Sequence, residues 1–192
     1  MKLTDIYQTL EDRNNYGDVE KNGPFFCSEK FPDGTLKKGI KEPWLGEGYY
    51  FWDTRIENAR WWGKTVYSKS GYVICHTRYN QHSPLLYDLV GDVGLFDEFV
   101  NCAELLVKRL KKEYLTVPAL LSFIRKTTDF QYKAIRVWPY NHNIQNTAVV
   151  FPDNKMVIGK MDKIQICFFD KTLLTEPYNI VFKNSSYENQ TI

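Results

Sequence analysis

A long helical stripe in the middle of the chain constrains the fold most strongly. Apolar residues recur at the spacing of one helix face: Phe96, Phe99, Val100, Ala103, Leu106, Val107 and Leu110. Acidic residues stand early in this stretch and lysines late, as the helix macrodipole favours. Thr116 and Pro118 are suited to begin a second helix, which would bury Leu120, Leu121 and Ile124. We therefore predict a helical hairpin over residues 92–127.

Sequence runs typical of β-strands flank this hairpin on both sides. Two precede it, GYVICHTRY (71–79) and PLLYDLVG (84–91), and four follow it, at residues 132–138, 147–151, 155–159 and 163–169. Turn-forming Gly, Pro, Asn and Asp residues separate these runs. Strands with the helices inserted as a block predict an α+β fold with a helical hairpin insertion.

The N-terminal pattern, the length and the composition predict an opening helix, the domain extent and the location of the protein. Leu3, Ile6, Tyr7 and Leu10 fall at helical spacing, which predicts a short opening helix. The length of 192 residues suits one domain, 1–192, in which residues 183–192, rich in Asn and Ser, are expected to be a flexible tail. The chain has no apolar run near the roughly 18 residues of a membrane span and no basic-then-apolar leader. These features predict a cytoplasmic protein without a membrane partner.

Several classes of site are not supported by the sequence. The 25 basic and 23 acidic residues are interspersed, giving a net charge of +2 that does not itself indicate a nucleic-acid partner. The four cysteines form no CxxC pair, and His76, His82 and Asp88 do not have a zinc-site spacing, so no metal is expected. The chain also lacks a Walker loop, a GxSxG elbow and a GxGxxG fingerprint.

The segment WLGEGYYFWDTRIENARWWG (44–63) is the strongest candidate for a binding site. It holds four of the five tryptophans, and its pattern predicts a strand, a tight turn and a short helix. Gly46 and Gly48 lack the Cβ that would keep a ligand away from the backbone, and flat rings suit a planar heterocycle. The alternative is that these tryptophans fill a core and that the glycines shape a bulge.

This segment resembles the second motif of the ADP-ribosyltransferase superfamily, in which a glycine-flanked aromatic strand leads into a short helix. KMDKIQICFFD (160–170) is similar to the last conserved strand of some bacterial branches. The resemblance implies a split antiparallel β-sandwich with a cleft for NAD+. It also implies transfer of ADP-ribose to a macromolecular acceptor, a protein or a nucleic acid, or hydrolysis of NAD+.

Site roles follow from the same resemblance. Tyr49 or Tyr50 and Trp52 would wall the nicotinamide side, Gly46 and Gly48 would admit the cofactor, and Gln165 would stand at the position of the catalytic carboxylate. At two positions this sequence differs from the family's pattern. The candidate opening strand, PFFCSEK (24–30), offers Ser28 where the family has Arg or His. An amide at 165 stabilises a cationic sugar less than a carboxylate does, so Glu29 or Asp162 would have to compensate.

Two other functions fit the same residues. A nucleotide or single-stranded nucleic-acid binding module would stack bases on the aromatics and clamp phosphates with Arg55, Arg60, Lys64, Arg78 and Arg136. An interaction domain would present Trp, Tyr and Arg to another protein. For Arg136 the sequence favours a solvated strand residue whose stem packs on Trp138.

Overall fold

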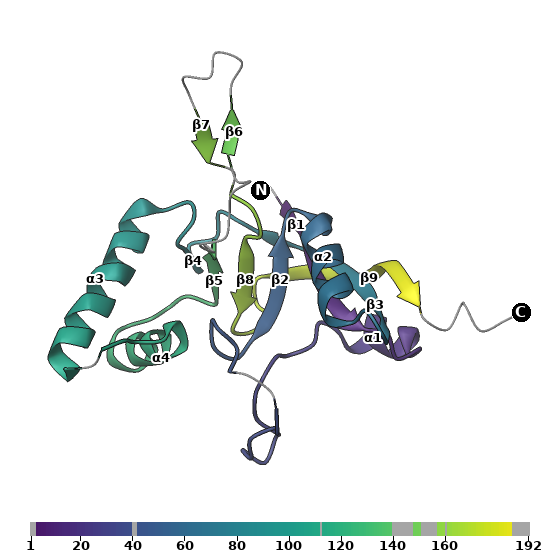
Figure 1. The fold of residues 1–192 in the computed structure, drawn as a ribbon, viewed down its shortest axis with the longest axis horizontal. Coiled ribbons are helices and arrows are strands. Elements are labelled where there is room, and N and C mark those ends of the chain that lie inside the picture. Colours follow the sequence, from purple (N-terminus) through teal and green to yellow (C-terminus); the bar gives the residue numbers. More distant parts are fainter. Residues whose placement is uncertain are drawn as a thin grey trace, which may run out of the picture.

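The computed structural model describes residues 3–39, 42–111, 113–139, 148–150, 157–159 and 161–185 (Figure 1). The helices are α1 (Tyr16–Asn22), α2 (Ile56–Val66), α3 (Val93–Leu110) and α4 (Val117–Thr127). The strands are β1 (Leu3–Glu11), β2 (Tyr49–Asp53), β3 (Gly71–Asn80), β4 (Leu86–Asp88), β5 (Ala134–Val137), β6 (Ala148–Val150), β7 (Val157–Gly159), β8 (Gln165–Phe168) and β9 (Leu174–Ser185). The described part of the chain is therefore a mixed structure of helices and strands, in agreement with the predicted α+β class.

One curled sheet organises the molecule, with the strand order β4-β5-β8-β2-β1-β3-β9, while β6 and β7 pair separately. All pairs in the large sheet are antiparallel except β4 with β5, which is parallel. The prediction of a purely antiparallel sheet is wrong at that pair. The α3–α4 hairpin connects the two strands, and such a long connection returns the chain in the same direction. The predicted hairpin itself is confirmed.

The two faces of the sheet pack against different elements. On one face, Tyr50 and Cys167 join a core with Leu106 of α3 and Leu121 of α4. On the same face, Trp52 packs with Ala59 of α2, because alternate residues of β2 point to one side. The opposite face carries the core around Ile6, Val19, Phe51, Phe168 and Tyr178, which α1 and β9 help to enclose.

The predicted opening helix is wrong, because residues 3–11 form β1. This strand lies between β2 and β3 in the middle of the sheet. Ile6 is buried in the core on one face, and Tyr7 packs against the core on the other. A strand covered on both faces loses its simple alternation of apolar and polar residues, so Leu3, Ile6, Tyr7 and Leu10 matched a helical spacing by coincidence.

The predictions differ from the structure at the C-terminal end as well. β9 was not predicted, since Pro177 lies within it and proline is unusual inside a strand. The structure accommodates this proline on an edge strand, beside a register shift between His76 and Arg78 of β3. β9 includes the first three residues of the predicted tail, and residues 186–192 lie outside the described part of the chain.

The other predicted strands correspond to observed ones. The runs predicted at 71–79, 84–91, 132–138 and 163–169 contain β3, β4, β5 and β8 in that order. Only β3 extends past its run, by the single residue Asn80. β6 and β7 lie within the runs at 147–151 and 155–159, whose residues 147, 151, 155 and 156 fall outside the described part. In the ranges that the structure describes, no helix has the length and apolarity needed to cross a membrane.

Gly48 offers a test of the packing between β2 and β8. A Cβ at this position would lie 2.5 Å from the Cys167 sulfur and 2.6 Å from the Phe168 carbonyl oxygen. Gly48→Ala should therefore lower the free energy of unfolding by about 1–3 kcal/mol, the usual cost of overpacking. Urea denaturation would measure the change. Gly17→Ala is the control, since nothing lies within 4 Å of a Cβ there and alanine favours helix α1. An equal loss in both variants would contradict this packing.

Candidate functional site

Trp52 and Gln165, both predicted site residues, lie side by side in the sheet. They are Cα partners on the adjacent strands β2 and β8, and Tyr50 is opposite Cys167 in the same register. Directly opposed residues of an antiparallel pair project to the same face. Trp52 and Gln165 therefore share the face that α2, α3 and α4 cover, at the end of β2 that leads into α2.

Trp44, from the turn that precedes β2, holds the Gln165 side chain in one orientation. The Trp44 indole nitrogen donates a hydrogen bond to the Gln165 amide oxygen over 2.6 Å. Trp44 itself packs against the core between the sheet and the hairpin. The amide oxygen keeps one further acceptor site, and the NH2 group of Gln165 can donate to another partner.

Three tryptophans form a cluster that reaches from the interior to the surface. Trp52 is buried, whereas Trp61 and Trp62 of α2 are 41% and 37% exposed. The three ring centroids are 6.0–6.1 Å apart. The Lys163 ammonium lies 3.5 Å from the centre of the Trp61 ring, which is a close cation–π contact. Trp52 thus fills a core, as the alternative interpretation of this segment expected, whereas Trp61 and Trp62 are partly exposed.

The Tyr50 side chain, on β2, contacts the turn that precedes this strand, to which Gly46 belongs. The Tyr50 hydroxyl accepts a hydrogen bond from the Leu45 backbone NH (2.8 Å) and donates one to the Gly46 carbonyl (2.7 Å). Burial raises the pKa of Tyr50, so this phenol stays protonated. Gly46 adopts a φ of +80°, which glycine tolerates and other residues rarely do. Tyr50 therefore braces the turn with its hydroxyl fully engaged.

Tyr49 and Gly48 stand apart from Gln165 and Trp52. Tyr49 alternates to the other face of the sheet, where its ring packs edge-on against Phe26 at 5.1 Å. Gly48 is in close contact with the Cys167 sulfur and the Phe168 backbone, so the missing Cβ serves strand packing. The structure thus separates these two predicted cofactor-binding residues from the pair at the far end of β2.

The predicted opening strand at residues 24–30 is not a strand. It makes single bridges, from Cys27 to Gly48 and from Lys30 to Leu36, and β1 is the strand that pairs with β2 and β3 inside the sheet. The Ser28 hydroxyl hydrogen-bonds to the Glu47 carboxylate. Ser28 consequently lies near the start of β2, whereas Gln165 is opposite the end of that strand.

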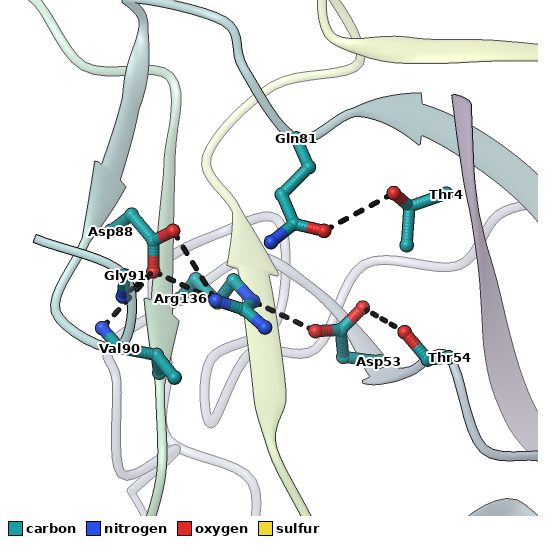
Figure 2. A network of polar contacts seen from close by, with 8 residues as sticks. All are labelled: Thr4, Asp53, Thr54, Gln81, Asp88, Val90, Gly91 and Arg136. Carbon is teal, nitrogen blue, oxygen red and sulfur yellow. Dashed lines mark hydrogen bonds and ion pairs between the residues drawn. The ribbon is translucent and has the colours of Figure 1, made fainter. Parts of the chain in front are cut away.

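A buried ion cluster that the sequence did not predict lies beside the site. The Arg136 Nε donates to Asp53 Oδ2 at 2.7 Å, and its Nη1 donates to both oxygens of Asp88 at 3.1 and 3.2 Å (Figure 2). Arg136 is 7% exposed and Asp53 is 3% exposed. The prediction of a solvated Arg136 is therefore wrong. Burial lowers the pKa of Arg136, but the two carboxylates more than offset this and raise it overall.

The phenol of Tyr79 completes the surroundings of this cluster. It is fully buried on the same face of the sheet as Asp53. Burial and the negative charge of Asp53 raise the pKa of Tyr79. In the sequence, the signal for this cluster was a charged residue, Arg136, inside the apolar run AIRVW. A side chain at this position of the strand points into the core.

A cavity of about 180 Å³ adjoins the ion cluster at the ends of β2 and β8. Its lining includes Arg136, Arg55 and Lys163 as basic residues, with Asn58 of α2 and Thr54 between them. The Asn58 amide nitrogen is buried without a hydrogen-bond partner. Trp52 and Gln165 are the chain neighbours of the lining residues Asp53 and Ile164, so this cavity borders the candidate site without including their side chains.

A larger cavity of about 460 Å³ lies at the opposite end of β2. The loop before β2 and helix α4 form it, with Glu29, Gly46, Glu47 and Arg125 among its lining residues. Its charges are mixed, and it includes Glu29, one of the two carboxylates proposed to compensate for Gln165. Glu29 and Gln165 are thus associated with different ends of the strand.

Most cations of the predicted nucleic-acid clamp already have partners. Arg55 pairs with Asp162 at 3.0 Å, and Arg78 pairs with Asp5 at 2.9 Å. Arg60 stacks over the Phe182 ring at 5.0 Å, and Arg136 is in the buried cluster. His76 also contacts Asp5, at 2.8 Å. In the described ranges, no group of three or more His, Cys, Asp or Glu residues is arranged to hold a metal ion.

Comparison of the chain with protein-family models, with curated proteins and with solved structures finds no match in any of the three. A functional proposal for this chain therefore depends on its own residues, contacts and cavities, together with the motif resemblance of residues 44–63 and 160–170.

Replacing Arg136 tests whether the ion cluster stabilises the fold. Arg136→Met keeps an unbranched stem but removes the guanidinium group, which leaves Asp53 and Asp88 without their cation. Breaking a buried pair in this way should lower the free energy of unfolding by about 3–5 kcal/mol. Arg13→Met is the matched control, because Arg13 pairs with Glu11 at the surface and should contribute less than about 1 kcal/mol. Similar small losses in both variants, measured by urea denaturation, would contradict the assigned role.

Proposed function

We propose that this chain is an ADP-ribosyltransferase-like domain that binds NAD+ at the ends of β2 and β8. In this proposal the curled sheet corresponds to the split β-sandwich of that superfamily. The bound cofactor would donate ADP-ribose to a macromolecular acceptor or be hydrolysed. The observation that carries the proposal is the register that makes Trp52 and Gln165 Cα partners on adjacent strands. The two residues are 113 positions apart in the sequence. Each comes from one of the two segments that carry the motif resemblance.

The surroundings of this pair support binding of a planar ring. Trp61 and Trp62 expose more than a third of their surface immediately beside Trp52. Stacking of a base on an aromatic side chain contributes about 1–3 kcal/mol. In the proposed complex the nicotinamide or adenine ring stacks on this aromatic surface, and the Gln165 NH2 group donates to a carbonyl or hydroxyl oxygen of the cofactor.

The small cavity supports binding of the diphosphate. Its volume of about 180 Å³ is below the roughly 300–1,000 Å³ of a complete ligand pocket, so it would hold a portion of a dinucleotide. Lys163 supplies positive charge at its wall, together with Arg55, whose charge is shared with Asp162, and the carboxylate of Asp53 also lines the cavity. An anionic group placed there would also reach the unpartnered amide of Asn58.

The amide at position 165 affects the expected rate of turnover. Loss of nicotinamide develops positive charge on the ribose, which a nearby carboxylate stabilises and an amide NH2 group does not. Asp162 is the nearer of the two suggested substitutes in sequence, and it is already paired with Arg55. We therefore propose tight positioning of NAD+ with slow release of nicotinamide.

A second candidate function rests on the exposure of Trp61 and Trp62. Two adjacent, partly exposed tryptophans are typical of a protein interaction surface. This function requires no small ligand, so the ligand tests below separate it from the first proposal.

Ligand-dependent melting tests the binding proposal. NAD+ and ADP-ribose at about a hundred times their dissociation constants should stabilise the protein by roughly 2.7 kcal/mol, seen as a raised melting temperature. Trp61→Ala should reduce the shift, since it removes a stacking surface. Tyr114→Ala is the control, since Tyr114 is 76% exposed and lies in the connection between α3 and α4. No shift with NAD+, ADP-ribose or nicotinamide at millimolar concentration would leave the interaction surface as the better function.

Variants of Gln165 separate binding from catalysis. Gln165→Ala should weaken NAD+ binding about two- to tenfold, the effect of one hydrogen bond. Gln165→Glu restores a carboxylate and should increase nicotinamide release over the wild-type rate, as measured by chromatography. If turnover is rapid in the wild type and unaltered in both variants, Gln165 has no part in the reaction.

A further inference from the structure

Helix α3 carries an exposed apolar stripe with alternating spacings of three and four residues. The stripe consists of Val93, Phe96, Val100, Ala103, Val107 and Leu110. Val93 is 73% exposed, Phe96 and Leu110 are each 48% exposed, and Val100 is 36% exposed. A 3-4 repeat of apolar residues is the pattern with which one helix packs along another in a coiled coil.

This stripe borders the face with which α3 packs on its own chain, and only Ala103 of the stripe also packs against that core. Phe99 and Leu106 are buried, and they share a core with Leu120, Leu121 and Ile124 of α4. The stripe lies next to that buried face around the helix, and Figure 1 shows α3 at the periphery of the molecule. The apolar surface of α3 is therefore wider than the described part of the chain covers.

The charges of α3 indicate which partner fits the stripe. Three acidic residues, Asp92, Asp97 and Glu98, lie near the N-terminal end of α3, and three basic residues, Lys108, Arg109 and Lys111, lie near its C-terminal end. Glu104 lies between the two groups. Two copies of this helix packed antiparallel would bring the acidic end of each against the basic end of the other. Two parallel copies would place like charges together. The charge pattern is thus complementary to itself in one orientation.

We propose that the chain forms a symmetric dimer in which the α3 helices of two copies pack antiparallel. The two-fold axis passes near the middle of the stripe, so Val100 of each copy meets Ala103 of the other, and the small alanine allows close approach. Phe96 meets Val107, and Val93 meets Leu110. Asp97 then lies close to Lys108 of the second copy. Such an interface is isologous, with the same surface on both copies, and it does not depend on NAD+ binding.

The length of α3 limits the strength of this dimer. Its 18 residues span about 27 Å, or two and a half heptads. A helix pair of this size is a small interface, so we expect a dissociation constant in the micromolar range. Sedimentation velocity over a concentration series should therefore show a shift from monomer to dimer.

A matched pair of substitutions tests the position of the interface. Val100→Glu places a charge at the centre of the stripe and should give a monomer at all concentrations. Leu105→Glu is the control, because Leu105 is on the same helix and 67% exposed but lies off the stripe; this variant should dimerise like the wild type. Far-UV circular dichroism would establish that both variants keep their helices. A wild-type monomer throughout the series, or equal disruption by both substitutions, would overturn the proposal.

A charge exchange tests the antiparallel orientation. Asp97→Lys should raise the dimer dissociation constant by about tenfold, since it opposes Lys108 of the second copy with a like charge. The double variant Asp97→Lys with Lys108→Asp exchanges the two charges and should return the constant to near the wild-type value. If the double variant has the same raised dissociation constant as the single variant, the antiparallel arrangement is overturned. If the wild-type protein stays monomeric and binds lipid vesicles, the stripe is not covered by a second copy and the proposal is overturned.

Discussion

The fold depends on one buried cation that links three strands far apart in the sequence. Arg136 of β5 binds Asp88 of the neighbouring β4 and reaches past β8 to Asp53 at the end of β2. The buried carboxylate of Asp53 and the half-buried one of Asp88 require such a partner, because desolvation of an unpaired charge is very unfavourable. Asp53 is the last residue of β2, and after it the chain turns through Thr54 into α2. The small cavity forms at this point.

The same end of the sheet holds the features on which the proposed function depends. Trp52 and Gln165 are placed by the pairing of β2 with β8, and Trp44 fixes the amide from the turn before β2. The outcome is a donor group beside an aromatic surface and a cavity with basic residues at its wall. In the proposed function these features would recognise a flat, anionic ligand. Rapid chemistry is not part of that proposal, because position 165 has an amide where the resembled family has a carboxylate that would stabilise a developing positive charge.

The sequence predicted the elements whose limits are marked by turn and cap residues. The α3–α4 hairpin follows local periodicity, and the strands β3, β5 and β8 are short apolar runs bounded by turn-forming residues. β1 was mistaken for a helix because its apolar residues fall at helical spacing by coincidence, and β9 was missed because Pro177 is accommodated by a bulge. The contact of Trp44 with Gln165 joins residues 121 positions apart, and Arg136 finds Asp53 across 83 positions. No local pattern encodes such pairs; they depend on strand order, which the spacing of residues does not reveal.

Nuclear magnetic resonance of the 15N-labelled protein during titration with NAD+ tests the central claim most directly. Binding at the ends of β2 and β8 should shift the side-chain NH2 signal of Gln165 and the indole NH signals of Trp61 and Trp62, while signals around Gly46 and Ser122 in the larger cavity stay in place. Shifts confined to the larger cavity, or no shifts at all at millimolar NAD+, would contradict the account.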